Sequence, residues 1–406
     1  MKDIMSNILR IGKDFILNIG ASILMVLATQ LIVYPAIAIK LNTDMYGLFL
    51  TLMGIAAMLA GAIGNSLNNV RIIMNNNYTY SKQEGDFSIL LLFGIFIIVI
   101  VFILFLNVFT ENLTSSLMYL LLVVIMTIRA YYSVAFRIKI NYKYVFVMNF
   151  ILSIAYICIT GWYYYFGIDY KKWILIFLIA EVTATIYVFA KSNLWKETFQ
   201  ITSLFPVTLK KYLNLIYLTI ISSLLLYFDR NLLYPLLGGK AVAVYFTASL
   251  VGKTIGIFVG PISNVLLSYF SQADFKMDIK KFWHINLLIT GFGAIGYIFS
   301  LLVSDFIVKV FYLDIYFEAR EFFPLANLVP ILNVIADMAR PTVLKFVELS
   351  KLSIVQTIFF ILTFVVSYYT VTTNGLYGFC CGAIGVSLFR VMAMWFLGHL
   401  ALCKGK

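Results

Sequence analysis

Eight ionisable residues interrupt runs of sequence that are otherwise almost entirely apolar. They are Arg129, Glu181, Asp229, Arg230, Lys253, Asp337, Arg340 and Arg390. A charged side chain at the centre of a bilayer costs about 2.5–3.5 kcal/mol on insertion scales, so eight of them cannot all face lipid. They must face the interior of a helical bundle or a water-filled cavity, and charged residues in such places are candidates for function.

The sign of this set indicates the charge of its ligand. Five members are cations and three are acids. A low-dielectric cavity with excess positive charge concentrates its field on a negative partner, and arginine presents a planar fork of donors that matches phosphate oxygens. We therefore expect a phosphate or pyrophosphate to bind within the membrane at Arg129, Arg230, Lys253, Arg340 and Arg390.

The three acids, Glu181, Asp229 and Asp337, are candidates to bind a coupling H⁺ or Na⁺. No other cofactor is expected. A metal site is not predicted either, because His284 and His399 are the only histidines and the four cysteines lack zinc or disulfide spacing.

An alternative interpretation is that some of these charges pair for structural reasons. Asp337 and Arg340 are three residues apart and share one helix face, where they could neutralise each other. Glu181 could pair with a cation on a neighbouring helix. Lys253 and Arg390 have no acid close in sequence, which makes them the strongest candidates for the cavity.

The composition identifies the solvent that surrounds the chain. Of its 406 residues, 62% are hydrophobic and only 12% are charged, with a mean hydropathy of +0.97. Soluble domains are about half apolar and about a quarter charged. Because the excess is spread along the whole chain, the sequence predicts a polytopic helical membrane protein and excludes a soluble domain with one anchor.

The apolar runs predict twelve transmembrane helices, each about 20 residues long. Residues 353–389 are uncharged but too long for one span, and they divide at the turn signal Thr372–Gly375. The eighth run contains three glycines and one proline, Gly252, Gly256, Gly260 and Pro261, and is expected to be kinked or tilted. The predicted spans are 15–38, 46–67, 87–109, 116–136, 145–166, 173–190, 212–237, 241–270, 284–303, 322–344, 353–371 and 376–400.

Lysine and arginine between the spans set the orientation. With the N-terminus inside, inner segments hold nineteen of these residues and outer segments six, which satisfies the positive-inside rule with both ends in the cytoplasm. This bias also accounts for the pI near 9.3 without nucleic acid. The first apolar run is too long for a cleaved signal, and residues 1–14 are expected to form an amphipathic helix on the inner surface.

The chain resembles a duplication. Tyr34-Pro35, Lys40 and Tyr46 recur in the second half as Tyr234-Pro235, Lys240 and Tyr245. Both copies cross the membrane in the same direction, as in parallel repeats. The sequence therefore predicts two six-helix bundles, residues 1–206 and 207–406.

Aromatic residues gather at predicted outer ends, as in residues 162–166. An interfacial belt explains them, and stacking against sugar rings is the functional alternative. Nothing in the sequence has the pattern of a catalytic triad or a phosphate-binding loop, so an enzyme is not predicted.

The stretches 227–233, 236–239 and 244–248 resemble the seventh and eighth helices of Wzx-type polysaccharide flippases. In that family an Asp-Arg pair precedes a Leu-Gly turn and then a Tyr followed by small residues; here these are Asp229-Arg230, Leu237-Gly238 and Tyr245. Residues 375–378 and 382–384 fit the last helix. Asp229 and Arg230 match the family pattern by position, and the other charged candidates match no family motif.

The resemblance implies the fold of the multidrug/oligosaccharidyl-lipid/polysaccharide exporter superfamily, with two bundles around a central cavity. It implies an undecaprenyl-pyrophosphate-linked oligosaccharide as substrate, carried across the bacterial inner membrane for O-antigen or capsule synthesis. A polysaccharide polymerase and a chain-length regulator would be its protein partners, beside membrane lipids.

Two alternatives remain. A drug/cation antiporter of the same superfamily would require an acidic cavity, against the sign found here. A membrane polysaccharide polymerase of the Wzy type has a large outer loop, whereas the longest predicted outer segment is 304–321.

Overall fold

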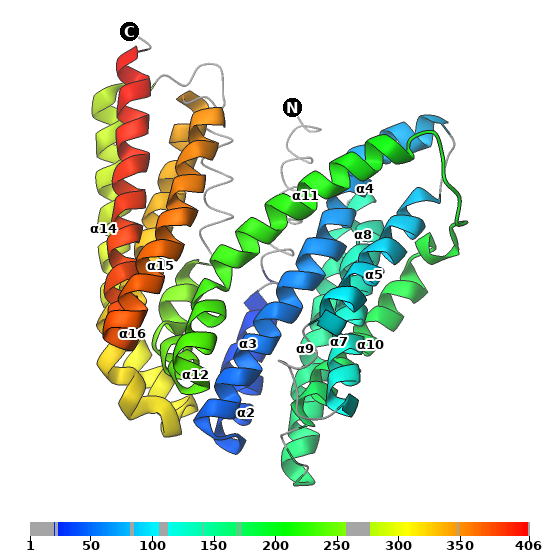
Figure 1. The fold of residues 1–406 in the computed structure, drawn as a ribbon, viewed down its shortest axis with the longest axis horizontal. Helices are drawn as coiled ribbons and strands as arrows, with labels where there is room; N and C mark the ends of the chain where they lie inside the picture. Colours follow the sequence, from blue (N-terminus) through cyan, green and yellow to red (C-terminus); the bar gives the residue numbers. More distant parts are fainter. Residues whose placement is uncertain are drawn as a thin grey trace, which may run out of the picture. The chain divides into compact units, whose positions relative to one another are not determined.

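The computed structural model describes residues 23–81, 85–104, 113–139, 141–167, 172–256, 277–346 and 349–404, together with Gly20 and Asp169, and for 340–355 and 404 the backbone alone. These residues form helices and connecting turns, without a strand among them (Figure 1). The all-helical prediction is thereby confirmed. The predicted inner-surface helix 1–14 lies outside the described residues.

The chain divides into two compact units, which we call the first unit (residues 1–42 and 49–231) and the second unit (residues 43–48 and 232–406). Residues 43–48 group with the second unit, where the Lys240 backbone N–H donates to Asp44 Oδ1 at 2.9 Å. The boundary predicted at 206/207 separates the two copies of a sequence repeat, which is a different property from compactness. It therefore stays a prediction.

The described part of the first unit contains α-helices, the two π-helical turns η1 and η2, and the 3₁₀ turn η4. They are η1 (Thr29–Val33), α2 (Tyr34–Lys40), α3 (Thr43–Ala60, whose first turn groups with the second unit), η2 (Gly61–Asn65), α4 (Ser66–Ser81), α5 (Asp86–Leu104), α7 (Leu113–Tyr132), α8 (Val134–Ile138), α9 (Tyr142–Tyr165), α10 (Trp173–Lys191), η4 (Leu194–Lys196) and α11 (Phe205–Leu226).

The second unit consists of fewer and longer helices. They are α12 (Phe228–Ala248, whose first turn groups with the first unit), the short helix Leu250–Gly256, α14 (Ile279–Phe311), α15 (Leu313–Phe346) and α16 (Leu349–Lys404). The last three run side by side in Figure 1 and pack against one another.

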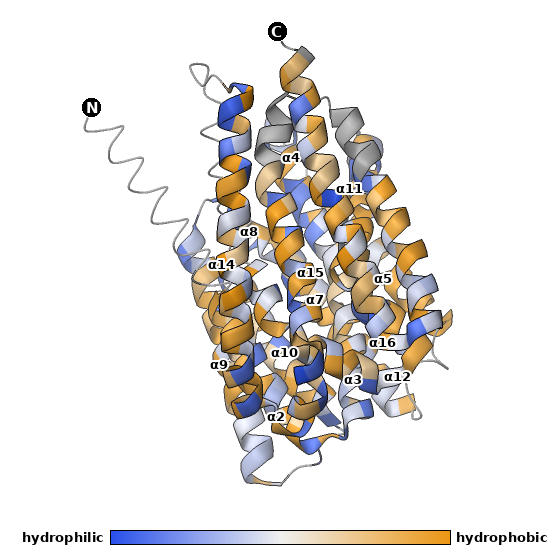
Figure 2. Cartoon of the chain, turned by 90° about the vertical axis from the view of Figure 1, so that its left-hand side faces the viewer, coloured by the Kyte–Doolittle hydropathy of each residue, from blue (hydrophilic) through white to orange (hydrophobic). Residues whose placement is uncertain are grey.

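The helices have the length and composition of membrane spans. In the described part of the chain ten are long and apolar enough to cross a bilayer, or eleven if the bent pair Phe228–Ala248 and Leu250–Gly256 counts as one span. Apolar residues cover most of their length (Figure 2). On α14, Phe292, Leu302 and Phe306 are 67%, 71% and 68% exposed, so this face is built for lipid rather than water.

The predicted division of the last apolar run is confirmed. The span Gln356–Cys403 has 48 residues, which as one helix would measure about 72 Å, over twice the hydrocarbon thickness. The helical geometry breaks at Asn374 and at Gly375, where φ is +58°. Glycine tolerates this left-handed region at little cost, so the break divides α16 into two crossings.

A second turn lies where the flippase resemblance places one. Gly238 has φ +81° inside α12, again a conformation that suits glycine. The kink predicted for the following run is also present, because the chain bends by 57° between Ala248 and Leu250. Residues 257–270 of that run lie outside the described residues.

Three predicted boundaries were wrong. The second span, predicted to end at residue 67, continues through α4 to Ser81. The outer segment 304–321 is helical except at Tyr312, since α14 and α15 continue beyond their apolar stretches. There, Asp305 accepts a hydrogen bond from Tyr316 Oη at 2.7 Å and lies 3.4 Å from Arg320 Nε, which stabilises the extension. The predicted seventh span, 212–237, begins earlier, at Phe205, and is broken at Tyr227.

The aligned lysines of the proposed repeat occupy different surroundings. Lys40 ends α2, with its Nζ 5.0 Å from the ring centroid of Tyr164. Lys240 instead follows the Gly238 turn, and its Nζ lies 2.9 Å from Glu318 Oε1. The two copies therefore turn at different offsets from their Tyr-Pro pairs.

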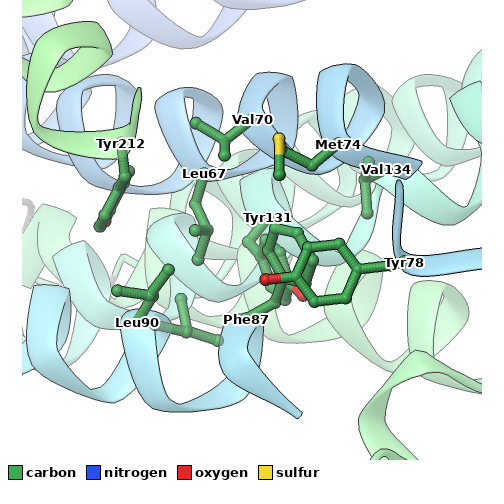
Figure 3. Packing of buried hydrophobic residues seen from close by; sticks show 10 residues of the cluster. Leu67, Val70, Met74, Tyr78, Phe87, Leu90, Tyr131, Val134 and Tyr212 are labelled. Atoms are coloured by element: carbon green, nitrogen blue, oxygen red, sulfur yellow. The ribbon is translucent and has the colours of Figure 1, made fainter. Parts of the chain in front are cut away.

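A buried cluster holds the first unit together at the predicted inner end. Figure 3 shows Leu67, Val70, Met74 and Tyr78 of α4 directed toward Phe87, Leu90 and Tyr131 of the neighbouring helices. The rings of Tyr78 and Phe87 are 4.8 Å apart between centroids.

Polar contacts at this end fasten the segment that follows α10. Glu197 accepts hydrogen bonds from both terminal nitrogens of Arg71, one of them at 2.8 Å. Asp86 Oδ1 accepts from the Thr202 backbone N–H at 2.8 Å. Residues 192–204 are therefore fixed to the first unit, and α11 packs against α4 in the same unit.

Candidate functional site

In the first unit, a charged pair bridges α7 and α10. Arg129 Nε donates to Glu181 Oε2 at 2.5 Å and Arg129 Nη2 donates to Oε1 at 3.1 Å. Tyr156 of α9 donates its hydroxyl to Oε1 at 2.9 Å. The interpretation that Glu181 pairs with a cation on a neighbouring helix is confirmed.

Aromatic rings close this pair off. Phe177 lies 5.1 Å from Tyr156 and 5.7 Å from Phe49 between ring centroids, and the Phe49 ring packs 4.8 Å from Trp173. The Glu181 side chain is 1% exposed. The three donors to this enclosed carboxylate provide its hydrogen-bond partners, because a buried charge without partners would be too costly.

Arg230 occupies a second polar position in the first unit. Its Nη1 donates to the Leu50 carbonyl of α3 at 3.0 Å, and its guanidinium lies 5.4 Å from the ring centroid of Tyr227. Gly54 of α3 lies beside this side chain, since a Cβ there would be in van der Waals contact with Arg230 Cδ at 3.4 Å. Asp229, the preceding residue, is buried as well.

In the second unit, another arginine–carboxylate pair joins α16 to α15. Arg390 Nη2 donates to Asp337 Oδ1 at 2.6 Å, and Nη1 donates to Asn333 Oδ1 at 3.0 Å. The guanidinium carbon lies 4.8 Å from the ring centroid of Phe359. Arg390 Nε is buried without a hydrogen-bond partner among the described residues.

This second pair is more open than the first. The Asp337 side chain is 42% exposed, while that of Arg390 is 11% exposed. The pairing of Asp337 with Arg340 that the sequence suggested stays a prediction, and the structure adds a bond from Arg390 to the same carboxylate. The side chain of Arg340 lies outside the described residues, although its backbone belongs to α15.

Lys253 lies on the short helix after the bend, half-buried. Its Nζ is 5.1 Å from the ring centroid of Tyr245 and 5.8 Å from that of Phe246. A lysine held against aromatic faces keeps its charge at low cost, because the ring quadrupole attracts the ammonium.

The structure thus brings Arg129 together with Glu181, and Arg390 together with Asp337. Two partners were missed at the sequence level. Asn333 stands four residues before Asp337 on the same helix face, a spacing that could have been noticed. Tyr156 lies in a run rich in aromatic residues, where nothing in the sequence marks it.

Chemically, both pairs offer donors and acceptors but no nucleophile–base arrangement. Among the described residues, no group of three or more His, Cys, Asp and Glu side chains could hold a metal ion. The chemistry available is the binding of charged groups.

The sequence matches no protein-family model and no curated protein. Solved structures do share its fold. The lipid II flippase MurJ, in an inward closed conformation, aligns with a TM-score of 0.69 at 16% identity over 96% of this chain and 86% of that chain.

Transporters align over a similar extent. An outward-facing multidrug resistance MATE family transporter of the MOP superfamily gives a TM-score of 0.62 at 15% identity, over 98% of this chain and 95% of that chain. A MOP superfamily transporter from Pyrococcus furiosus, described as having a binding pocket of reverse polarity that suggests a different function, gives 0.58 at 13% identity over 98% and 95%. At these identities the likeness establishes the fold alone, which this chain shares with the flippase and the two transporters.

Proposed function

We propose that this protein is a flippase that moves a lipid-linked oligosaccharide across the bacterial inner membrane by way of its pyrophosphate. The proposed substrate is an undecaprenyl-pyrophosphate-linked repeat unit for O-antigen or capsule synthesis, with a polysaccharide polymerase and a chain-length regulator as partners. The fold supports transport as the general activity, and the charge of the buried residues supports an anionic substrate.

The observation that carries the proposal is the sign of the charged candidates, which are five cations and three acids. Two of the acids, Glu181 and Asp337, each lie beside an arginine. Charges enclosed in a low-dielectric surrounding attract an anion far more strongly than they would in water.

In this mechanism the head group of the substrate enters from the inner face, and cations hold its pyrophosphate while the lipid tail stays in the bilayer. A change between inward-open and outward-open states then releases it outside. Arg390 is the residue best placed to exchange partners. The carboxylate of its partner Asp337 is half-exposed, so a phosphate oxygen of the substrate can take the place of that carboxylate. Asp337, once released, could take up the coupling H⁺ or Na⁺.

Reconstitution tests the proposal directly. The purified protein is inserted into liposomes that contain a prenyl-pyrophosphate-linked oligosaccharide, and a glycosidase added outside reports how much of the sugar becomes accessible over time. The proposal predicts transfer in liposomes with the protein and none in liposomes without it. Absence of transfer, or full transfer by an Arg390→Ala, Lys253→Ala double variant, would contradict it.

A drug/cation antiporter is the second candidate, and one observation favours it. The chain spans 95% of the MATE transporter of the MOP superfamily but 86% of MurJ. The same liposomes loaded with a cationic dye separate the two: efflux of the dye in exchange for H⁺ or Na⁺, without transfer of the oligosaccharide, would identify an antiporter.

A further inference from the structure

The second unit holds a pocket at the end where α12 and α16 are broken and α14 is joined to α15. The interruptions are Gly238 in α12, Tyr312 between α14 and α15, and Asn374–Gly375 in α16. In Figure 1, the turn between α14 and α15 lies at the same end of the unit as α12. By the predicted topology this is the outer end.

The pocket has the size and lining of a small-ligand site. Its volume is ≈ 410 Å³, within the range of about 300–1,000 Å³ typical of such sites. Leu237, Phe317 and Leu376 provide apolar wall, and Phe317 is 74% exposed. An apolar wall at the end of membrane spans lies at the depth where lipid head groups meet acyl chains.

The pocket is lined by one cationic and two acidic side chains. Lys240 Nζ lies 2.9 Å from Glu318 Oε1. Glu321 stands one helical turn further along α15 and also lines the pocket. In the described part of the chain, Glu321 takes part in no recorded hydrogen bond or ion pair. The pocket therefore offers one ammonium and a second, unengaged carboxylate beside an apolar wall.

We propose that this pocket binds the head group of a zwitterionic phospholipid of the phosphoethanolamine type. The phosphate would contact Lys240, the ammonium would contact Glu321, and an acyl chain would lie along Leu237 and Leu376. A phosphoethanolamine head group joins a negative and a positive charge through a short spacer, which complements a lysine and a carboxylate on neighbouring helices. This site is separate from the proposed transport of an anionic substrate.

Other lipids complement the pocket less well. An anionic lipid would meet Glu318 and Glu321 with no ammonium to offer. A simple alkylammonium ion would satisfy Glu321 but would gain nothing from Lys240. Lysine and carboxylate must therefore both contribute if the head group is zwitterionic, and that requirement makes the proposal testable.

The test measures binding to the purified full-length protein in maltoside detergent by native mass spectrometry. The probes are lysophosphatidylethanolamine, lysophosphatidylglycerol, dodecyltrimethylammonium and free phosphoethanolamine. Lysophosphatidylethanolamine should bind best, and Glu321→Gln and Lys240→Met should each weaken it about fivefold, the upper end for a charge contact at a partly exposed position. Asp314→Asn removes a carboxylate from the exposed first turn of α15, outside the pocket, and should leave binding unchanged.

Several results would overturn the proposal. Equal binding of lysophosphatidylglycerol would remove the role of the ammonium, and dodecyltrimethylammonium binding that ignores Lys240→Met would indicate a plain cation site. Free phosphoethanolamine binding as tightly as the lysolipid would indicate a soluble ligand instead. A loss of binding in Asp314→Asn equal to that in Glu321→Gln would reduce the effect to general surface charge.

Discussion

The two arginine–carboxylate pairs of this protein have the same chemistry and opposite surroundings. The Glu181 side chain is 1% exposed beneath aromatic rings, whereas that of Asp337 is 42% exposed. A fully enclosed pair cannot exchange partners without leaving a bare charge behind. A pair with one side open can release its arginine to a competing anion, so accessibility distinguishes a structural pair from one available to substrate.

The largest difference is expected when the carboxylate charge is removed from each pair. Glu181→Gln leaves Arg129 buried without its counter-charge and should lower the free energy of unfolding by about 3–5 kcal/mol. Asp337→Asn is the matched change in the open pair and should cost less, because Arg390 is as buried as Arg129 but its partner carboxylate is 42% exposed and water can take that place. Thermal unfolding of the purified variants in detergent measures both, and equal losses would refute the distinction between the pairs.

Removing the arginine of the open pair should affect transport more than stability. We expect Arg390→Met to slow oligosaccharide transfer in liposomes at least tenfold, which corresponds to about 1.4 kcal/mol of lost interaction. The control is Arg320→Met, because the Arg320 side chain is 62% exposed on the same unit and contacts Asp305 rather than the open pair. If both variants transfer substrate at the same rate, Arg390 has no special role.

The hydroxyl of Tyr156 is a further donor to the closed pair, Arg129–Glu181, and its removal tests whether that pair is structural. Tyr156→Phe removes one donor to Glu181 while keeping the ring, and should cost about 1 kcal/mol of stability, as single polar contacts in membrane bundles do. Transfer of the oligosaccharide should remain normal. A variant that is stable but inactive would assign Glu181 a role in transport after all.

The smallest effect is expected at Asn333, the neutral partner in the open pair. Asn333→Ala removes the oxygen that accepts from Arg390 Nη1 and should cost about 0.5 kcal/mol, since water can replace a partner near an exposed carboxylate. Substrate affinity should change less than it does in Arg390→Met. An effect as large as that of Arg390→Met would mean that Asn333 itself contacts the substrate.

Most of the fold could be predicted from the sequence, because length and hydropathy determine where helices cross a membrane. The breaks at Gly238 and Gly375 were expected from turn-forming residues in long apolar runs. The helical structure of residues 304–321 was not expected. Polar residues at helix ends resemble a loop in the sequence, and only their mutual contacts show that the helices continue.

The site was less accessible to sequence analysis. Charged residues inside spans could be identified, but their partners could not, since Arg390 and Asp337 are 53 residues apart and meet only through the rotation of two helices. Spacing in the sequence suggested only Arg340, which lies three residues after Asp337. The two pairs differ in how deeply the acid is buried. In the closed pair this burial depends on aromatic side chains from several helices, which no local sequence pattern indicates.

The central claim is that the protein interior selects an anion, and the most direct measurement compares two ligands that differ in charge. Farnesyl pyrophosphate and farnesyl trimethylammonium can be titrated against the purified full-length protein by isothermal calorimetry at low salt. We predict tighter binding of the pyrophosphate, weakened by added salt and by Arg390→Met. Preferential binding of the trimethylammonium ligand would contradict the account and favour a cation transporter.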